Sequence, residues 1–432
     1  MRLGGWGCFP FIESECLSFD NVTKLNQMVQ TQSPFIAYGN GRSYGDAALY
    51  KKHIQMQRLN RLLSFDESSG LLTCEAGVLM SDIIKIFLPK GWFLKVTPGT
   101  KLITVGGAVA SDVHGKNHHI EGCFSECIKN FDLLIPDGSV ITCSKTENTN
   151  WFQATCGGMG LTGVIVRVSF YLKQVSSQWI NQTTIKTQNL EDTFNAFELH
   201  KNSTYSVAWI DCLAKGSHLG RSLLMLGEFA EDDDLNYQPK QHLNIPINFP
   251  NFVLNQYTVK FFNLLYYGRI TTKTTDQKIG IDSFFYPLDA IKNWNRIYGK
   301  NGFIQYQFIL PKEHSLAGLK EILELISTSS MGSFLAVLKL YGKGNDNWLS
   351  FPIEGYSLAL DFKMQPKLLP FIEKLGLALI KHRGKIYLAK DAVVKKEIFD
   401  LGYPKVNQFR QFREQYKLNK HFKSLQSIRL EL

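Results

Sequence analysis

The chain has 432 residues, long enough for two or three domains that each bury a core. Its composition, 44% hydrophobic and 20% charged, is that of a folded protein and excludes a largely disordered one. The formal charge of +10 favours an anionic partner such as a phosphate or a membrane surface, whereas the scattered Lys and Arg residues argue against nucleic acid.

The eight cysteines form no C-x-x-C pair and no zinc-ribbon spacing, so we expect free, mostly buried thiols in a reducing compartment. Cys123 and Cys127, like His114 and His118, are four residues apart and could contribute to a metal site, but we predict none. No segment reaches the ~18 apolar residues of a membrane span, and the N-terminus lacks a signal-peptide pattern. We therefore expect a cytoplasmic protein, with association to a membrane from that side left open.

The first predicted elements lead into a glycine-containing loop. Residues 22–29 carry apolar side chains at helical spacing, and residues 35–38 are typical of a short strand. The glycine spacing in the next loop is not the dinucleotide fingerprint, and no helix pattern follows at once. Arg42, Ser43 and Tyr44 give this loop a positive charge, a hydroxyl group and an aromatic face.

Strands and one helix are predicted after this loop. Residues 54–76 alternate enough for two strands joined by a turn, and residues 79–92 show an amphipathic helix pattern. Residues 131–143 are typical of a hairpin with a Pro-Asp-Gly turn. A later G-x-G-x-x-G match at residues 158–163 is followed by a β-branched strand instead of a helix, so it fails the context of a Rossmann fold.

The stretch from residue 97 to 122 is the most informative part of the chain. It is rich in glycine, contains three histidines, and has enough apolar residues to pack as an ordered segment. Glycines let backbone amides approach a ligand closely, and successive amides form anion-binding nests. The stretch therefore favours a phosphate-bearing cofactor, with a set of tight turns between short strands as the alternative.

From about residue 175 the glycine loops stop, and polar strands alternate with aromatic clusters. Residues 228–260 are too long and irregular for a simple connection, so we expect a mobile lid or a disordered insert. Residues 261–267 are strongly apolar and aromatic.

Three later predicted strands carry candidate functional side chains. In residues 303–310, alternation puts Gln305 and Gln307 on one face, either as a polar binding floor or as a solvated surface. Lys339 lies among apolar residues of the next strand, either as an edge-strand gatekeeper or as a ligand contact. The third strand runs from residue 356 to 364.

The C-terminal part begins with a helix pattern that closes at Gly384, followed by a short strand at 385–391. From residue 403 onward, Lys or Arg at 410, 413, 417 and 420 follows helical spacing and predicts a basic amphipathic helix. Its basic face is either solvated or in contact with a membrane surface.

Three motifs together carry a family resemblance: GNGRSYGD at residues 39–46, TPGTKLITVGGAVASDVHGKNHH at 97–119 and GGMGLTGVI at 157–165. With them, the chain resembles the vanillyl-alcohol-oxidase-type FAD-linked oxidases. Within this family it is most similar to the members that oxidise decaprenylphosphoryl-β-D-ribose at the 2′-hydroxyl. The match continues in collinear order over nearly the whole chain, as far as YLAKD at 387–391.

The resemblance implies an α+β fold, with a two-part FAD-binding domain of the vanillyl-alcohol-oxidase type and an inserted antiparallel-sheet substrate-binding domain. The FAD-binding domain would comprise residues 1–174 and 385–432, and the insert residues 175–384. The change in composition near residue 175 and the return of pattern near 384 agree with these boundaries independently.

The resemblance also implies which residues contact FAD. Its pyrophosphate carries two negative charges, and glycine-loop amides with nearby cations can replace the water around them. Many members attach FAD covalently through a histidine in a G-x-G-H-S loop, and this chain has Arg42 at that position, so we expect non-covalent FAD. The implied cofactor-binding residues are Ala37, Tyr38, Gly39, Asn40, Gly41, Arg42, Ser43, Tyr44, Gly45, Asp46, Ala47, Gly99, Thr100, Thr104, Val105, Gly106, Gly107, Ser111, Asp112, Val113, His114, Ile165 and Tyr387.

Carried over in the same way, Lys390 would take the proton of the substrate hydroxyl, with His114, Tyr44 and Lys116 beside it as further catalytic residues. A lysine base needs its pKa lowered from about 10.4 by burial and neighbouring cations. A protonated Lys390 would instead orient the hydroxyl or stabilise charge on the reduced flavin, and an ion pair with Asp391 is the structural alternative. The implied substrate-binding residues are Tyr267, Gln305, Gln307, Lys339, Ser357, Ala359 and Lys390.

The backbone between residues 387 and 390 and the residue types at 357 and 359 further constrain the implied site. Strict alternation puts Tyr387 and Lys390 on opposite faces, so a bulge or turn is needed if both meet the flavin. Ala359 stands where some members have a cysteine, so inhibitors that bond to that thiol should not do so here. Ser357 stands where an asparagine is familiar, which leaves its polar contacts open.

The function implied is FAD-dependent oxidation of the 2′-hydroxyl of a polyprenylphosphoryl-β-D-ribose to a ketone, the first half of epimerisation to the arabinose form. A short-chain-type reductase would complete the epimerisation. The basic net charge, the apolar segment 228–267 and the basic C-terminal helix suit a lipid-phosphate substrate and peripheral membrane contact. The alternatives are an FAD-dependent oxidase of soluble sugars, alditols or aldonolactones, and a non-catalytic lipid-phosphate-binding flavoprotein.

Overall fold

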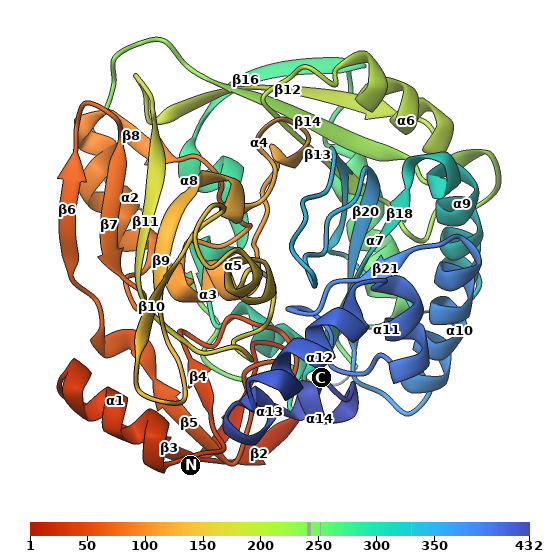
Figure 1. The fold of residues 1–432 in the computed structure, drawn as a ribbon. Helices are drawn as coiled ribbons and strands as arrows, with labels where there is room; N and C mark the ends of the chain where they lie inside the picture. Colours follow the sequence, from red (N-terminus) through yellow and green to blue (C-terminus); the bar gives the residue numbers. More distant parts are fainter. Residues whose placement is uncertain (240–242, 251, 330) are drawn as a thin grey trace.

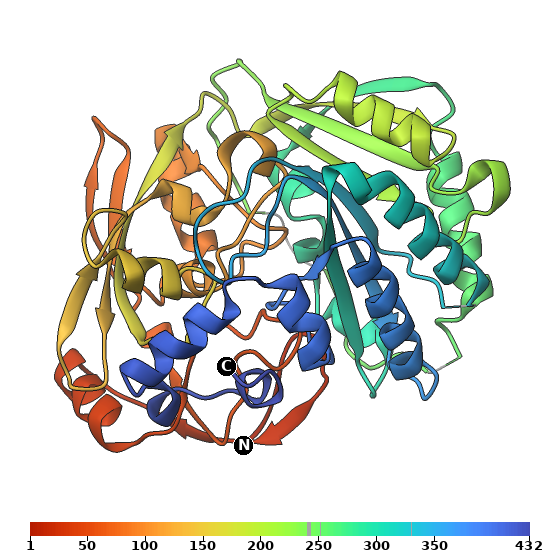
Figure 2. The ribbon, with the colours of Figure 1, turned by 45° about the vertical axis from the view of Figure 1, so that its right-hand side comes forward.

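Figure 1 shows the computed structural model of the chain, which describes residues 1–239, 243–250, 252–329 and 331–432. Two large antiparallel sheets dominate it, with helices and three smaller sheets around them in the described residues. The two ends of the chain lie close together on one side of the molecule in both ribbon views (Figures 1 and 2).

The N-terminal segment forms small sheets and one helix. A three-stranded parallel sheet has the order β3-β5-β4, and β1 pairs with β2. The predicted helix and the predicted short strand are both confirmed, and Leu25 and Val29 are the buried residues of α1. The bounds are β1 Arg2–Gly4, β2 Phe11–Glu13, β3 Glu15–Leu17, α1 Val22–Thr31, β4 Ile36–Tyr38 and β5 Lys52–Gln55.

The first large sheet has the order β10-β9-β11-β7-β6, and β8 also pairs with β11. It contains the predicted strand pair, the predicted Pro-Asp-Gly hairpin and the β-branched strand after the G-x-G-x-x-G match, so these predictions are confirmed. The predicted amphipathic helix is α2. The bounds are β6 Leu62–Asp66, β7 Leu71–Glu75, α2 Met80–Phe87, β8 Trp92–Leu94, α3 Val105–Ala110, α4 His118–Glu121, β9 Ile128–Leu134, β10 Val140–Cys143, α5 Thr149–Thr155 and β11 Val164–Gln174.

The second large sheet has the order β16-β12-β14-β13-β19-β20-β18-β21, and all its strand pairs are antiparallel. Helix α6 packs on β12 and β14, α9 packs on β18 and β20, and α10 packs against α9 (Figure 2). These helices cover one face of the sheet. The bounds are β12 Trp179–Thr187, α6 Leu190–Leu199, β13 Tyr205–Ile210, β14 Ser222–Phe229, β16 Thr274–Gly280, α8 Ile281–Phe285, β18 Phe303–Pro311, α9 Lys312–Thr328, β19 Ala336–Tyr341, β20 Gly355–Lys363, α10 Leu368–Lys381 and β21 Lys385–Ile386.

The long irregular segment predicted at 228–260 is only partly described, because residues 240–242 and 251 lie outside the described residues. Within it, β15 (Leu243–Asn244) pairs in parallel with β17 (Ile291–Lys292). It leads into the helix α7 (Gln256–Gly268).

The C-terminal residues return to the N-terminal part of the fold. They form α11 (Lys396–Gly402), α12 (Val406–Gln415), α13 (Leu418–His421) and α14 (Leu425–Arg429). The guanidinium of Arg429 on α14 pairs with the carboxylates of Asp46 (2.9 Å) and Asp391 (2.7 Å). This clasp joins three segments that are far apart in the sequence.

The predicted basic amphipathic C-terminal helix is wrong. The helical pattern breaks at Lys417, whose φ is +55°, and Arg413 points inward with 1% of its surface exposed. The Arg413 guanidinium donates to the backbone oxygens of Leu161 (3.0 Å) and Phe422 (2.5 Å). The spacing of the basic residues is helical, but one of them is a buried structural side chain, so no continuous basic face exists.

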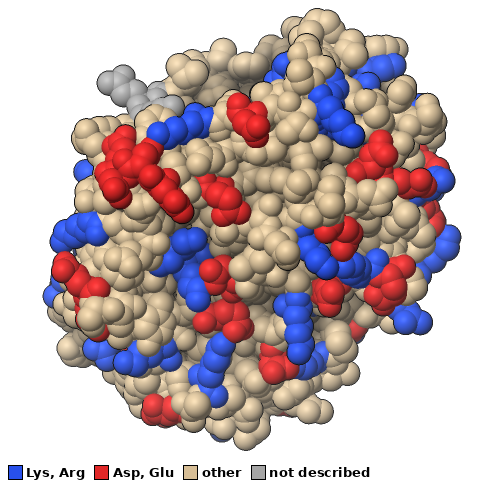
Figure 3. All heavy atoms as spheres, turned by 90° about the horizontal axis from the view of Figure 1, so that it is seen from above, with Lys and Arg blue, Asp and Glu red and all other residues tan. Residues whose placement is uncertain are grey.

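In the part of the chain that the structure describes, no helix is both long and apolar enough to cross a bilayer. On the face drawn in Figure 3, basic and acidic side chains are interspersed. The net positive charge is thus not gathered into one patch on that face.

Candidate active site

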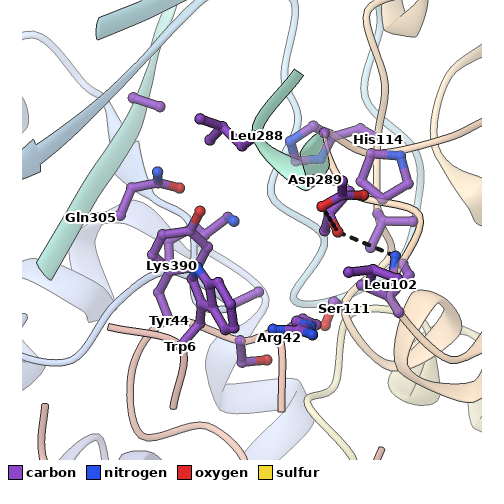
Figure 4. A pocket seen from close by; sticks show the side chains of 18 of the residues that line it. Trp6, Arg42, Tyr44, Leu102, Ser111, His114, Leu288, Asp289, Gln305 and Lys390 are labelled. Carbon is purple, nitrogen blue, oxygen red and sulfur yellow. Dashed lines mark hydrogen bonds between the residues drawn. The ribbon is translucent and has the colours of Figure 1, made fainter. Parts of the chain in front are cut away.

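A cavity of about 870 Å³ is lined by residues from both halves of the fold. Its walls come from the loop after β4, the segment 98–116 and the face of the second sheet that α6 and α9 leave uncovered. Figure 4 shows Arg42, Tyr44, His114, Gln305 and Lys390 arranged around this space.

The loop after β4 lines the cavity with residues 39–44. Gly41 has a φ of +60°, which glycine adopts without steric cost. Asn40 holds the loop in place, since its Nδ2 donates to Leu102 O at 2.7 Å and its Oδ1 accepts from Gln57 Nε2 at 2.7 Å. Among the described residues, no protein acceptor is found for the backbone N–H groups of residues 40–43. Adjacent amides of this kind form a concave donor site for an anion.

Arg42 adds a partly buried cation to this wall. Its guanidinium lies 4.1 Å from the centroid of the Trp6 ring, and its Nε is buried without a hydrogen-bond partner in the described residues. Burial lowers the pKa of Arg42, and the nearby carboxylate of Asp289 partly opposes this shift. A buried donor without an acceptor is costly, so the site has a donor to offer an anionic ligand.

The segment 98–107 forms the neighbouring wall. A Cβ built on Gly99 would meet no atom within 4 Å, so this glycine borders open space. Thr104 caps α3, because its Oγ1 accepts from the N–H of Gly107 at 3.1 Å. A Cβ on Gly39 would lie 2.5 Å from the same Oγ1, so the two glycine segments touch only because Gly39 has no side chain.

His114 lies in an aromatic group within the cavity wall. Its ring centroid is 5.1 Å from Tyr341, 5.5 Å from Phe351 and 4.9 Å from Tyr387, and its Nε2 is 3.4 Å from Gln307 Nε2. Burial, with a smaller contribution from Lys339, lowers the pKa of His114 well below its usual value. The imidazole is therefore uncharged at neutral pH, where it can position a ligand but carries no positive charge.

A chain turn brings Tyr387 and Lys390 to the same cavity. Strand β21 ends at Ile386, and the N–H groups of Lys390 and Asp391 donate to Tyr387 O at 3.0 and 3.1 Å. The predicted strand at 385–391 is therefore correct only for its first two residues. The turn that strict alternation required is present, and the Tyr387 hydroxyl donates to Ser111 O at 3.0 Å.

Lys390 is partly buried and lies close to a tyrosine ring. Its Nζ is 3.7 Å from the ring centroid of Tyr44, whose backbone N–H donates to Ala389 O at 3.0 Å. Burial lowers the pKa of Lys390 to about 7, with a smaller lowering from Lys339 and an opposing effect of Asp361. The alternative of an ion pair with Asp391 is wrong, because that carboxylate pairs with Arg429 and accepts from the N–H groups of Val393 and Val394.

Two further partly buried lysines line the same cavity. Burial and the charge of Lys339 lower the pKa of Lys116 to about 7, and its Nζ donates to Phe284 O and lies 4.3 Å from the Phe284 ring centroid. Burial lowers the pKa of Lys339 to about 8. Strand β19 lies between β13 and β20, so Lys339 is not an edge-strand gatekeeper. The cavity thus gathers three amines that change charge close to neutral pH.

Gln305 and Gln307 on β18 also line the cavity, with 9% and 5% of their surface exposed, so the solvated-surface alternative is wrong. Gln305 Nε2 donates to Asp361 Oδ1 at 2.6 Å, and the Tyr298 hydroxyl donates to Asp361 Oδ2 at 3.1 Å. Burial raises the pKa of Asp361 to about 7 despite these hydrogen bonds. The Asp361 carboxyl group, which titrates near neutral pH, therefore holds the Gln305 side chain through a hydrogen bond.

Comparison with known proteins adds to this geometry. A family model described as an FAD binding domain matches residues 20–144. The decaprenylphosphoryl-β-D-ribose oxidase of Mycolicibacterium smegmatis is 34% identical over 450 aligned residues, which cover 100% of this chain and 97% of that protein. The chain belongs to the family of vanillyl-alcohol-oxidase-type FAD-linked oxidases.

Two other similar proteins extend the comparison. An uncharacterised protein of Streptomyces coelicolor is 26% identical over 78% of this chain and 95% of its own length. The L-gulonolactone oxidase of Bos taurus is 27% identical over 46% of this chain and 45% of its own length. As a member of this family, the protein is an FAD-dependent oxidoreductase that acts on a CH–OH group.

The residues of the cavity fit the cofactor of an FAD-linked oxidase. In the described part of the chain, the N–H groups of residues 40–43 and the Nε of Arg42 have no protein acceptor, so they would be available as donors to the two phosphates of FAD. A side chain at residue 99 would occupy part of the open space that Gly99 borders. Hydrogen-bond donors and open space therefore occur together at the place where a pyrophosphate needs both.

Most of the residues expected to bind FAD or substrate in this FAD-linked oxidase line the cavity. Six of them do not. The carboxylate of Asp46 pairs with Arg429, Gly45 packs against the backbone of Asp391, and Val105 is a fully buried core residue. The other three are Tyr38, Asp112 and Tyr267.

Asp112 and Tyr267 have structural contacts instead. The Asp112 side chain is fully buried and accepts from Ser125 N, Asn345 Nδ2, Asn347 Nδ2 and Ser350 Oγ at 2.7–3.0 Å, so it anchors the 345–350 loop. The Tyr267 hydroxyl donates to Thr187 O at 2.9 Å, and its ring lies beside Arg221. Tyr267 therefore packs α7 against the second sheet and does not line the cavity.

Sequence reasoning missed Trp6, Asp289 and Asp361. Asp289 lines the cavity and accepts from Thr100 Oγ1 (2.7 Å) and Lys101 N (2.9 Å). Asp361 follows Ala359 by two residues on the same strand, so alternation along β20 could have placed it on the face turned to the cavity. Trp6 and Asp289 approach the site through chain folding that no local pattern indicates.

Proposed function

We propose that this protein oxidises the 2′-hydroxyl of a polyprenylphosphoryl-β-D-ribose to a ketone, with FAD as the cofactor. The observation that carries the proposal is the collinear 34% identity to a decaprenylphosphoryl-β-D-ribose oxidase over the full length of this chain. The three lysines that line one cavity support it, because a phosphate-bearing substrate is anionic.

In this proposal residues 1–174 and 385–432 form the FAD-binding domain and residues 175–384 the substrate-binding domain. The second large sheet, which lies almost entirely in 175–384, would cover the flavin end of the cavity. Contacts of the C-terminal residues with the N-terminal part, such as the Arg429 clasp, support this division.

When bound, FAD supplies the hydride acceptor for alcohol oxidation. Lys390 takes up the proton of the 2′-hydroxyl, since a pKa of about 7 leaves a large fraction of its amine neutral at neutral pH. Tyr44 holds the Lys390 Nζ against its ring face, and the Tyr387–Ser111 hydrogen bond holds the turn that carries Lys390. His114 and Lys116 flank the reacting atoms.

The sugar would be held by the side chains that the second sheet turns into the cavity. Gln305 and Gln307 offer amide donors and acceptors to the remaining hydroxyls, and Lys339 offers a cation. Ser357 and Ala359 line the same wall, and the small side chain of Ala359 leaves no thiol there for a covalent inhibitor.

A reductase of the short-chain type would act on the keto sugar and return it with inverted configuration at C2. Together the two reactions would convert the ribose form to the arabinose form. This partner follows from the chemistry of the product, since a ketone is not the end point of an epimerisation.

The proposal is tested by anaerobic reduction of the bound flavin. Polyprenylphosphoryl-β-D-ribose should bleach the flavin absorption band, whereas free alditols and aldonolactones should leave it unchanged. Bleaching by alditols with no response to the lipid-linked ribose would favour the soluble-sugar alternative, for which the partial match to L-gulonolactone oxidase is the supporting observation. No bleaching by any sugar, with flavin bound, would favour a non-catalytic flavoprotein.

We propose further that FAD is bound without a covalent link. The described lining of the cavity includes no cysteine, and Arg42 stands where a covalently linked histidine occurs in other members. Acid or heat denaturation should therefore release all of the flavin into the supernatant. Yellow colour that stays with the precipitated chain after washing would contradict the proposal.

A further inference from the structure

Helix α7 exposes an apolar stripe where a water-soluble helix would have a polar one. Tyr257, Phe261, Leu264 and Leu265 have 74%, 63%, 55% and 58% of their surface exposed. Their spacing of four, seven and eight residues puts them on one side of the helix. The buried side includes Asn263, whose Nδ2 donates to Asp211 Oδ1 at 2.7 Å. Val259 and Tyr267 are buried on the same side, so α7 carries apolar side chains on both its buried and its exposed side.

The exposed apolar side chains are concentrated in this region. Among the described residues, thirteen large apolar side chains have more than half of their surface exposed, and seven of these lie between residues 243 and 265. Besides the four on α7, they are Leu243, Ile247 and Phe252. A monomeric soluble protein rarely concentrates so much apolar surface without a partner for it.

This surface continues to the cavity. Tyr266 on α7 and Arg269 directly after it line the cavity, as does Ile291 on the strand that pairs with Leu243. The Tyr266 ring lies 4.7 Å from that of Trp209 on β13, another lining residue. A molecule that rests on the outer side of α7 is therefore next to the wall of the catalytic cavity.

The charge of the same region has one sign. No Asp or Glu occurs between Leu235 and Thr275, whereas Lys260, Arg269 and Lys273 lie in or just after α7 and are exposed. Exposed aromatic and leucine side chains with flanking cations and no acids are the composition of helices that lie in a bilayer interface and attract anionic lipids.

We propose that α7 is the surface by which this protein docks on an anionic lipid bilayer, with Tyr257, Phe261, Leu264 and Leu265 inserted among the lipids. The proposal deepens the proposed function, because the isoprenoid tail of the substrate can stay in the membrane while its sugar enters the cavity beside α7. It replaces the C-terminal helix, whose buried Arg413 breaks the basic face, as the membrane-binding element.

Vesicle flotation with the purified, flavin-loaded full chain tests this directly. The wild-type protein should float with phosphatidylcholine vesicles that contain phosphatidylglycerol, and less with phosphatidylcholine alone or at high salt. The F261E/L265E variant should lower the partition coefficient about tenfold or more, because two apolar anchors become anions. The matched control L377E/L401E changes two leucines with exposures of 70% and 69% on α10 and α11, and should float as the wild type does.

Two further measurements, of folding and of oligomeric state, accompany the flotation assay. The ratio of flavin to protein absorbance shows whether F261E/L265E is folded, and the milder F261S/L265S replaces it if that ratio falls. The proposal is overturned if the wild type does not float, or if the folded variant floats as well as the wild type. It is also overturned if light scattering shows a wild-type dimer that the variant converts to a monomer with no change in flotation, because α7 would then bind a second copy of the chain.

The test separates this inference from the proposed function. Flotation uses vesicles without substrate, so it does not depend on which sugar is oxidised. Bleaching of the flavin by a water-soluble, short-chain polyprenylphosphoryl ribose should be unchanged in F261E/L265E, while bleaching by the same sugar in vesicles should fall with the partition coefficient. Loss of bleaching in the wild type with intact flotation would instead contradict the proposed function alone.

Discussion

Replacing Lys390 with methionine is expected to slow reduction of the flavin by substrate about 10²- to 10⁴-fold, the range that positioned proton transfer contributes. Methionine keeps the length of the side chain and suits its partly buried site, but it cannot accept the hydroxyl proton. Anaerobic stopped-flow absorbance measures the rate, and the ratio of flavin to protein absorbance measures FAD binding, which should be retained. An unchanged rate would remove Lys390 from the mechanism.

The matched control is Lys395→Met, five residues further along the chain. Lys395 pairs at 3.0 Å with Glu373, and both side chains are about half exposed. Because it does not line the active-site cavity, its loss should leave the rate of flavin reduction unchanged. A fall in rate similar to that of Lys390→Met would indicate a general effect of removing positive charge.

The pH profile distinguishes the two roles left open for Lys390. Its pKa is lowered from its ordinary value to about 7, so the neutral amine becomes the main form as the pH rises through about 7. If the neutral amine is the base, the rate of reduction should rise about tenfold per pH unit below 7 and level off above it. If the ammonium form orients the hydroxyl, the rate should fall above pH 7, and Lys390→Met should lose this dependence in either case.

Asp112→Ala is expected to lower the free energy of unfolding by about 3 kcal/mol or more, because it removes the acceptor of several buried donors. These donors come from Ser125 and from the 345–350 loop, which precedes Phe351 in the aromatic group around His114. Weaker FAD binding should accompany the loss of stability. Urea unfolding followed by circular dichroism, and titration with FAD, measure the two effects.

Asp112→Asn is the control for this variant. The φ of Asp112 is +39°, a conformation that asparagine tolerates better than most residues. The amide oxygen can keep part of the hydrogen bonding, so the loss of stability should be clearly smaller than for alanine. Equal unfolding midpoints for Asp112→Ala and the wild type would contradict the anchoring role.

The parts of the site that the sequence could predict are those that depend on local pattern and on the family motifs. Alternation along a strand predicted that Gln305 and Gln307 share one face, and they do so in β18. The same alternation predicted that a turn is needed between Tyr387 and Lys390, and this turn is present. Whether Lys339 was at an edge could not be predicted, because strand order joins segments far apart in the chain.

The failures have the same origin. Arg413 fits a basic helix by its spacing, but its partners are the backbone oxygens of Leu161 and Phe422, which a helical projection does not include. Asp112 lies in the most informative stretch of the sequence, yet its carboxylate is held by a loop more than 200 residues away. Long-range contacts of this kind decide which polar side chain faces a ligand and which supports the fold.

The ion pairs between Arg429 and the carboxylates of Asp46 and Asp391 have a consequence for biosynthesis. Arg429 is 383 residues beyond Asp46, so the loop that carries Asp46 lacks this support until almost all of these residues have left the ribosome. At 5–20 residues per second, this delay is roughly 20 to 80 s. The loop would therefore gain its full support only once residue 429 has been made, and a chain whose translation stops short of residue 429 should bind flavin more weakly.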